Sequence, residues 1–218
     1  MMVASVNFTA ERELKPVMGD SALKYIPRSD ESDLVARLKK GDESAFRMIV
    51  ETRKDLVYNT ALGLLQNAGD AEDITQEVFI KVYESVHQFK GESAFSTWLY
   101  RIAVTKSLEM IRNRKRKKRF AFVTSLFGEN NEPRHDPPDF VHPGVQMDNR
   151  EKASMLFKAI AKLPENQRIA FTLHKVEGVP YQEISEIMKI TVSAVESLIH
   201  RAKANLRKWL EDFYLKED

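Results

Sequence analysis

The chain contains no cysteine, which excludes a disulfide framework and thiolate-ligated zinc or iron–sulfur sites and is typical of a reducing compartment. It also lacks any run of about 18 apolar residues and any signal-peptide core, so we expect no membrane span, no export and a cytoplasmic location. Positive and negative charges nearly balance, since 34 Lys and Arg residues against 32 Asp and Glu residues give a net charge of +2. The net charge therefore identifies no nucleic-acid partner, whereas the distribution of charge along the chain is informative.

Apolar residues recur at spacings of three and four in two blocks, which is typical of amphipathic helices. The first block begins at Ser32 and predicts four helices that form one bundle. We expect Asn67 to Asp70 to break this block after its second helix, with Asp70 as the N-cap of the third. The second block runs from Met155 to Leu210. No long alternating, strand-like segment occurs, so the predicted fold class is all-α.

The composition along the chain divides it into four segments. Residues 1–29 have weak periodicity and predict a poorly ordered extension. Residues 30–119 form the first helical domain and residues 148–213 the second. Residues 120–147 between them are acidic and rich in proline, which predicts a flexible linker.

A short helix, a tight turn and a longer helix between Tyr181 and Lys208 match a DNA-binding helix-turn-helix. The longer helix carries small polar residues near its start, which permit close approach to base edges, and longer cations further on, which reach phosphates. The candidate DNA-binding residues are Ser193, Glu196, Ser197, His200, Arg201 and Lys203. A plain helical hairpin with a solvated face remains the structural alternative.

The first domain ends in a strongly basic run, in which seven of the eight residues from Arg112 to Arg119 are cationic. So many like charges repel one another unless an anion compensates them, which favours a phosphate-binding patch. Its candidate residues are Arg112, Arg114, Lys115 and Arg116. The alternative is a solvated helix end whose cations interact with the helix dipole.

Several segments resemble the extracytoplasmic-function (ECF) sigma factors of the sigma-70 family. The segments Asp70–Phe79 and Phe89–Val104 resemble that family's polymerase-binding and promoter-melting segments. The segments Leu163–Arg168, Tyr181–Ile187 and Val195–Ala202 resemble the module that reads the −35 promoter element. The likeness extends from about Ser32 to Lys208, in the order and spacing of the family.

The resemblance implies a non-catalytic, all-α protein with a four-helix region 2, a helix-turn-helix region 4, and no cofactor, metal or small-molecule substrate. Its partners would be the RNA polymerase core (clamp helices and flap), promoter DNA and an anti-sigma factor. The implied core-binding residues are Asp73, Gln76 and Glu77. Those implied for binding and melting the −10 element are Phe89, Lys90, Phe95, Trp98, Arg101 and Thr105. Thr105 stands where many family members carry Asn.

Two other functions fit parts of the sequence. A one-component helix-turn-helix regulator accounts for residues 150–210 but leaves the aromatic segment at Phe89–Tyr100 without a role. A hydrolase would have to use His135, His142 or His174, yet no nucleophile elbow, phosphate loop or metal-ligand spacing accompanies them. We therefore expect a sigma factor that initiates transcription of a stress or envelope regulon.

Overall fold

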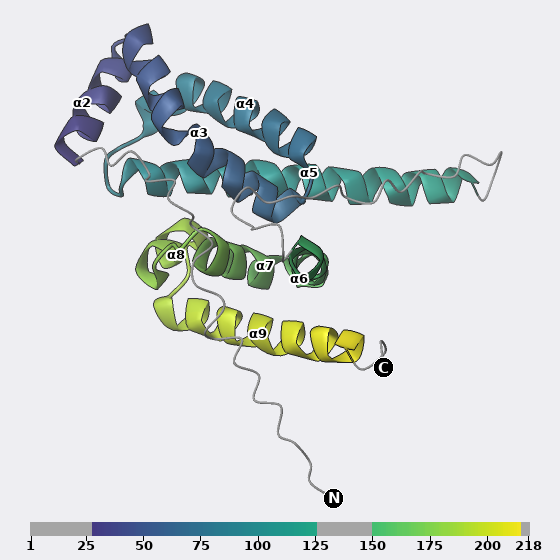
Figure 1. Cartoon of the computed structure of the whole chain (residues 1–218). Helices are drawn as coiled ribbons and strands as arrows, with labels where there is room; N and C mark the ends of the chain where they lie inside the picture. Colours follow the sequence, from purple (N-terminus) through teal and green to yellow (C-terminus); the bar gives the residue numbers. More distant parts are fainter. Residues whose placement is uncertain (1–27, 126–149, 215–218) are drawn as a thin grey trace, which may run out of the picture.

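The computed structural model describes residues 28–125 and 150–214, and every regular element within these ranges is helical (Figure 1). The N-terminal domain comprises α2 (Arg28–Lys39), α3 (Glu43–Leu65), α4 (Ala68–Ser85), the short 3-10 helix η1 (Val86–Gln88) and α5 (Phe95–Ser125). The C-terminal domain comprises α6 (Arg150–Lys162), α7 (Glu165–Phe171), the π-helical turn η3 (Thr172–Val176), α8 (Tyr181–Met188) and α9 (Val192–Tyr214). The predicted all-α architecture of two helical domains is confirmed. Residues 1–27 and 126–149, which hold most of the expected extension and linker, lie outside the described residues.

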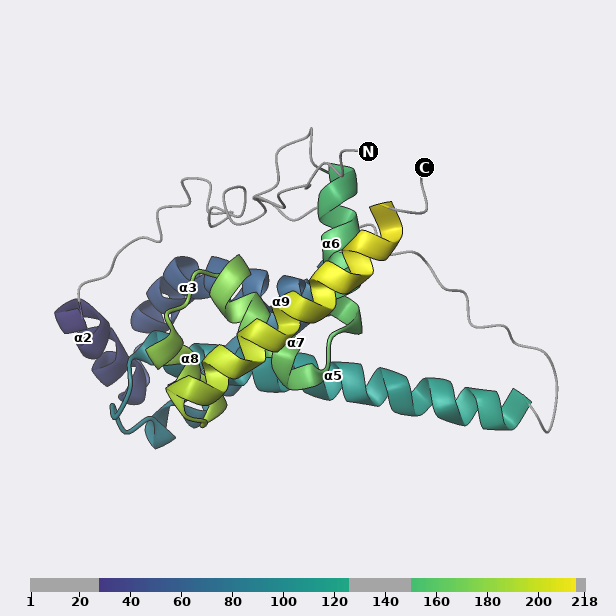
Figure 2. The same cartoon turned by 90° about the horizontal axis from the view of Figure 1, so that it is seen from below.

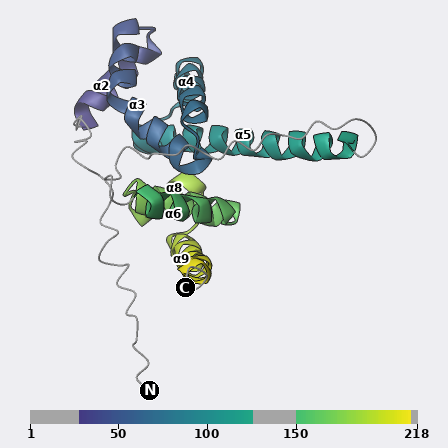
Figure 3. The same ribbon diagram turned by 45° about the vertical axis from the view of Figure 1, so that its right-hand side comes forward.

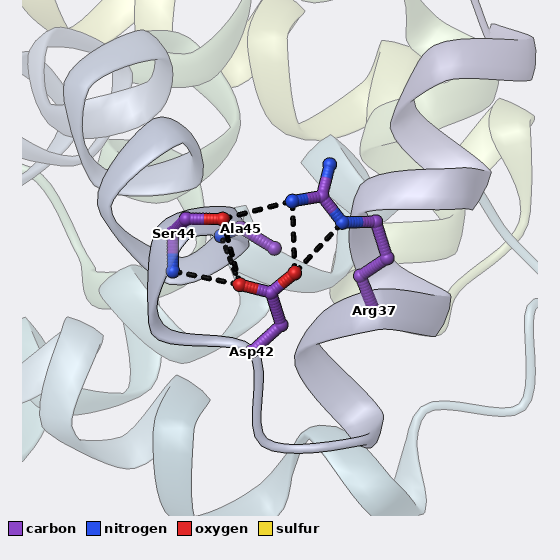
Figure 4. Close-up of polar contacts among 4 residues, drawn as sticks. All are labelled: Arg37, Asp42, Ser44 and Ala45. Atoms are coloured by element: carbon purple, nitrogen blue, oxygen red, sulfur yellow. Dashed lines mark hydrogen bonds and ion pairs between the residues drawn. The ribbon is translucent and has the colours of Figure 1, made fainter.

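The turn between α2 and α3 is fixed by glycine conformation and by a helix cap. Gly41 has φ +83°, which only glycine adopts readily, and this lets the chain reverse after α2. Asp42 Oδ1 then accepts hydrogen bonds from Ser44 N at 2.8 Å and Ala45 N at 3.3 Å, while Oδ2 accepts one from Arg37 Nε at 2.8 Å (Figure 4). Hydrogen bonds from the Ser44 hydroxyl, and next from Arg37, hold the pKa of Asp42 far below its usual value. The start of α3 is thereby tied to the end of α2.

The start of α4 differs from the sequence-based expectation. Asn67, and not Asp70, is the N-cap, because its extended backbone lets Asn67 Oδ1 accept the Asp70 N–H at 2.9 Å. The prediction of an Asp70 cap was therefore wrong. Asp70 lies in the first turn, where its side chain is buried and forms a bidentate ion pair with Arg114 of α5.

The N-terminal domain is organised around α3, which packs against α2, α4 and α5. Its core includes the fully buried side chains of Leu62, Ile74 and Leu99. Beyond this core α5 continues to Ser125 and so includes the first residues of the predicted linker, 120–125. Its basic end extends past the other helices (Figure 1, Figure 3). Arginine and lysine have high helix propensity, which allows such an end to stay helical.

The C-terminal domain packs α6, α7 and α9 around the buried Ile160, Phe171 and Leu206. The helix-turn-helix turn follows α8, where Lys189 closes the helix with φ +55°, and Thr191 Oγ1 then accepts the Ala194 N–H at 3.3 Å. In Figure 2, α9 crosses α7 and α8 diagonally as the outermost helix. The domain lies against the first one, with α8 on α5 and η3 on α3. None of the helices within the described ranges is long and apolar enough to cross a membrane.

Candidate nucleic-acid interface

The start of α9 displays the candidate base-reading residues on its outer side. Val195, Ile199 and Ala202 are buried against the rest of the domain, which turns the opposite side of the helix outward. All six predicted residues of this surface are solvent-exposed: Ser193, Glu196, Ser197, His200, Arg201 and Lys203. The structure therefore brings the predicted −35 residues together on one accessible helix face, as a helix entering a major groove requires.

A shallow depression of about 420 Å³ on this face is lined by Glu196, Ser197, His200 and Arg201. Arg201 Nε donates a hydrogen bond to the Ser197 carbonyl oxygen at 3.1 Å, so the guanidinium lies along its own helix. Ser197 Oγ donates in turn to the Ser193 carbonyl oxygen at 2.9 Å. Around the depression the helix thus presents both a carboxylate and a cation, and either can meet a base edge.

The aromatic segment before and within α5 forms a compact ring cluster. The ring centroids of Phe89, Phe95 and Trp98 lie 5.3 to 5.5 Å apart, pair by pair. Phe95 is only 3% exposed and belongs to the core, whereas Phe89 and Trp98 are half-buried. Lys39 Nζ lies 5.8 Å from the Phe89 ring centroid and donates to the Phe89 carbonyl oxygen at 2.6 Å. Of the three predicted rings, Phe89 and Trp98 retain surface that an unstacked base can reach.

The remaining predicted −10 residues differ in accessibility. Lys90 and Thr105 are exposed. Arg101 instead faces the second domain, where its Nη2 and Nε donate to the Glu186 carbonyl oxygen of α8 at 2.7 and 3.1 Å. In this arrangement the Arg101 guanidinium already has a hydrogen-bond acceptor within the protein.

The four predicted phosphate-binding residues lie on α5 and are all exposed: Arg112, Arg114, Lys115 and Arg116. Two of them have carboxylate partners. Arg112 forms an ion pair with Glu165 of α7 at 2.5 Å, and the hydrogen bond between them raises the pKa of Arg112. Arg114 forms the ion pair with Asp70 that is described above. Lys115 and Arg116 lie further along the extended end of the helix, where they are open to a phosphate backbone.

The acidic face of α4 is the third predicted surface. Asp73, Gln76 and Glu77 are exposed there, as the helical repeat implies for residues three and four apart. Glu77 also forms an ion pair with Lys106 of α5 at 3.1 Å. The face therefore combines open hydrogen-bonding groups with one carboxylate that is already held by a cation.

Two large apolar residues, which the sequence-based prediction did not include, extend this face. Ile80 is 59% exposed and Tyr83 is 50% exposed, which is unusual for large apolar side chains on a packed helix. At about 100° per residue they share the outward stripe of Gln76. They fall outside the buried repeat of Ile74 and Val82, and that mismatch with the repeat is the signal that could have identified them.

The comparisons with known proteins match both domains. Residues 49–117 match "Sigma-70 region 2" and residues 154–206 match "Sigma-70, region 4". The chain is 36% identical to the ECF RNA polymerase sigma-E factor of Escherichia coli K12 over 170 aligned residues. The alignment covers 78% of this chain and 88% of that protein. It is 33% identical over 186 aligned residues to the RNA polymerase sigma-H factor of Pseudomonas aeruginosa, and this alignment covers 85% of this chain and 96% of that protein. The chain belongs to the ECF sigma factors of the sigma-70 family.

Two solved structures share the fold of this sigma factor. CnrH, in complex with the cytosolic domain of CnrY, is 20% identical with a TM-score of 0.61 and covers 84% of this chain and 97% of its own. RpoE of Bartonella quintana, in complex with the anti-sigma factor NepR, is also 20% identical, with a TM-score of 0.56 and coverage of 76% and 96%. Since both alignments extend over most of each chain, the likeness includes both helical domains.

Family membership decides between the functions that the sequence left open. Sigma factors direct RNA polymerase to promoters without a catalytic activity of their own, and the match to both regions excludes a one-component regulator. Of the histidines considered for a hydrolase, His135 and His142 lie outside the described residues. His174 Nδ1 lies 3.1 Å from the Val179 carbonyl oxygen, and its ring centroid lies 4.5 Å from that of Tyr181.

Proposed function

We propose that this sigma factor binds the polymerase core through α4, melts the −10 element with the segment around the start of α5, and reads the −35 element with α9. The observation that supports it best is the outward face of α4. Its exposed polar residues adjoin exposed Ile80 and Tyr83, an apolar centre with a polar border of the kind found at protein interfaces. A protein partner that covers this face would bury apolar surface that is otherwise in contact with water.

The α4 face divides into two parts with different expected energetics. Tyr83 is the expected anchor, because tyrosine is enriched among the residues that contribute most to binding energy, and Ile80 adds apolar area beside it. The aromatic contact of Tyr83 with Phe46, whose ring centroid is 5.2 Å away, holds it in place before binding. Asp73, Gln76 and Glu77 would form the polar border, which contributes more to orientation and association rate than to affinity.

The promoter contacts would be shared between the two domains. Phe89 and Trp98 would stack on bases of the separated −10 strand, while Lys90 and Thr105 would contact its backbone or base edges. Lys115 and Arg116 would contact phosphates. The start of α9 would enter the major groove of the −35 element. On this assignment Phe95 supports the two stacking rings from beneath and does not itself touch DNA.

We extend the proposal to the family's regulation. RpoE of Bartonella quintana was solved with an anti-sigma factor, which supports a protein inhibitor for this chain as well. The genes it controls would belong to a stress or envelope regulon, and its place of action would be the cytoplasm, where polymerase and chromosome are. Affinity purification of the chain from its own cells, followed by run-off transcription on genomic fragments with reconstituted holoenzyme, identifies both the inhibitor and the promoters.

The α4 assignment is tested by competition for core polymerase against another sigma factor. Tyr83→Ala should weaken core binding about tenfold or more, as loss of a buried aromatic anchor does. Gln76→Ala combined with Glu77→Ala should weaken it by less. Glu51→Ala is the matched control, because it removes an exposed carboxylate from the neighbouring α3. If Tyr83→Ala and Glu51→Ala compete as well as the unmodified chain, α4 is not the core-binding face.

A further inference from the structure

The π-helical turn η3 is fixed by packing at its start and reaches the surface at its centre. Thr172 and Leu173 are fully buried, and Thr172 Cγ2 packs so closely on α3 that a Cβ atom at Gly63 would come within 2.7 Å of it. The next two residues, His174 and Lys175, are half-buried. The turn therefore holds an imidazole and an ammonium group at the surface on a base with little room to move.

The His174 ring is held in one orientation by two contacts. His174 Nδ1 lies 3.1 Å from the Val179 carbonyl oxygen, and the ring centroid lies 4.5 Å from that of Tyr181. Since a carbonyl oxygen only accepts hydrogen bonds, Nδ1 must carry a hydrogen whether the ring is neutral or charged. Nε2 is therefore the atom that gains or loses the proton, and the charged ring has a second N–H to donate.

Two lysines lie close enough to affect the charge of the His174 ring. Burial is the main cause that lowers the His174 pKa, the hydrogen bond to Val179 opposes it, and the charges of Lys175 and of Lys203 on α9 lower it further. We call His174, Lys175 and Lys203 the η3 cluster. It places two permanent cations around a histidine, which disfavours the charged ring until an anion offsets them.

No carboxylate in the described part of the chain is among the groups that offset these cations. Glu177, three residues after His174, has its pKa raised to about 8 by burial, so most of its carboxyl groups are protonated at pH 7. The end of α3 beside η3, residues 56–65, has no charged side chain. The charged residues of the other neighbouring helices do not contribute to the His174 shift: Glu165 and Arg168 of α7, Glu183 and Glu186 of α8, and Arg207 of α9.

Lys203 connects the η3 cluster to the face of α9 that is proposed to read the −35 element. It lies seven residues after Glu196, on almost the same line of the helix and about 10 Å further along it. On the opposite flank of α9, Asn205 Nδ2 donates to Gln167 Oε1 of α7 at 2.9 Å. A helix in a major groove has a phosphate strand along each flank, and cations there contact the backbone. The η3 cluster is placed at one such flank.

We propose that the η3 cluster binds a backbone phosphate of duplex DNA beside the −35 element, with His174 as a proton-dependent contact that takes up a proton at Nε2 and donates it in a hydrogen bond to a phosphate oxygen. This inference rests on the proposed function of α9 for the identity of the DNA. The phosphate offsets the charges of Lys175 and Lys203, so binding raises the His174 pKa and takes up a proton. Affinity for DNA must then rise as pH falls through the interval between the free and bound pKa values.

The free chain tests the site without polymerase. Contacts to backbone phosphates do not depend on sequence, so a short duplex at low salt is a sufficient probe. The titration of the His174 ring is followed by nuclear magnetic resonance, with its signals assigned by their loss in His174→Gln. Added duplex should raise the His174 pKa. Lys203→Gln should raise the His174 pKa in the free chain and reduce the further rise that duplex causes.

Promoter binding by reconstituted holoenzyme at pH 6 and 7.5 gives the second readout. Between these values the unmodified chain should lose about threefold to tenfold more affinity than His174→Gln, since one pKa unit corresponds to tenfold. His174→Arg carries a permanent cation, so it should bind at least as tightly as the unmodified chain at pH 7.5. Any contribution of His200 is the same in these proteins. His87→Gln is the matched control, because it removes an exposed histidine of the other domain, and it should keep the pH dependence of the unmodified chain.

The dependence on salt counts the phosphate contact itself. At pH 6 the slope of log affinity against log salt should be smaller by about 0.9 in His174→Gln than in the unmodified chain, which corresponds to one phosphate contact. At pH 7.5, where most His174 rings are neutral in the free chain, the two slopes should differ less.

An unchanged His174 pKa on addition of duplex would overturn the proposal, as would a rise that is equally large in Lys203→Gln, which would be a general effect of a polyanion. An equal rise with inorganic phosphate at the same phosphate concentration would overturn the assignment to DNA. Identical pH dependence in the unmodified and His174→Gln holoenzymes would also contradict it, and so would His174→Arg binding as weakly as His174→Gln. A holoenzyme that does not bind −35 DNA would count against the proposed function of α9 alone, because the titration of the free chain does not require it.

Discussion

The Glu177 carboxyl makes the stability of this fold depend on pH. One of its oxygens, Oε1, is enclosed without a hydrogen-bond partner in the described part of the chain, and burial raises the pKa of the group from 4.5 to about 8. Tyr100 of α5 lies close enough for the Glu177 charge to raise the Tyr100 pKa, after the larger effect of burial. Between pH 4.5 and 8 the folded chain thus keeps a proton that the unfolded chain has lost. The free energy of unfolding must fall as pH rises through this interval.

The size of the effect follows from the same values. The pKa of Glu177 rises from 4.5 to about 8, or by roughly 3.5 units, and each unit corresponds to about 1.36 kcal/mol. The loss of unfolding free energy across this pH interval can therefore reach at most about 5 kcal/mol. The side chain keeps partial access to water, which lowers the cost of ionising it in place. We therefore expect about 2 kcal/mol. Glu177→Gln should remove this loss because the amide does not titrate.

Urea unfolding at pH 5, 6.5 and 8 measures the difference. The unmodified chain should lose about 2 kcal/mol more than Glu177→Gln between the first and last pH. His174, whose pKa is lowered mainly by burial, titrates in both proteins and cancels in the comparison. Glu72→Gln, which changes an exposed carboxylate of α4, should keep the pH dependence of the unmodified chain. Equal pH dependence in the unmodified and Glu177→Gln proteins would refute the reasoning.

Two ion pairs give further stability predictions, both measurable by urea unfolding. Arg53→Met should cost about 3–5 kcal/mol, because Arg53 pairs with the buried Glu31 at 2.6 Å and its loss leaves that carboxylate uncompensated; a cost near zero would contradict this. Arg114→Ala should cost about 1–3 kcal/mol by leaving the buried Asp70 without its partner, whereas Arg116→Ala on the exposed end of α5 should change stability little. Similar effects of these last two variants would show that the Asp70 pair contributes nothing.

Local features of the fold could be predicted from the sequence because neighbouring residues determine them. Apolar spacing predicted the helices, and the buried Ile74 and Val82 of α4 lie where that spacing puts them. The cap of α4 was predicted wrongly because Asn67 and Asp70 are both good capping residues. In the structure Asn67 accepts the Asp70 N–H, and Asp70 instead pairs with Arg114, a residue distant in sequence. The exposure of the α9 residues that are predicted to read the −35 element followed for the same local reason, since one helical stripe is buried.

The contact between the two domains could not be predicted in this way. It depends on residues that are distant in sequence, such as Gly63 and Thr172, whose complementarity has no local signature. Arg101 shows the consequence for function. Its residue type fits DNA binding, but its hydrogen bonds in the free chain go to Glu186. Residue type and spacing therefore identify what a side chain can bind, while the packing of the two domains determines which partner it has in the free chain.

The proposed reading of the −35 element by α9 is tested most directly by changing Glu196 and measuring which −35 bases are preferred. Glu196 is exposed beside Ser197, His200 and Arg201, around the depression at the start of the helix. A carboxylate there can accept a hydrogen bond from cytosine N4, and it repels phosphates.

Glu196→Arg should shift the preferred −35 sequence toward guanine, whose N7 and O6 accept a bidentate arginine contact. Such a contact discriminates between bases by about 1–3 kcal/mol, or roughly five-fold to more than a hundredfold. Ala204→Arg adds the same cation to an exposed position further along α9, so it should raise affinity without changing the preference. Selection of −35 variants from a randomised pool by each holoenzyme measures both effects. If Glu196→Arg and the unmodified chain recover the same consensus, Glu196 does not determine specificity, and Ser197, His200 and Arg201 become the next residues to test.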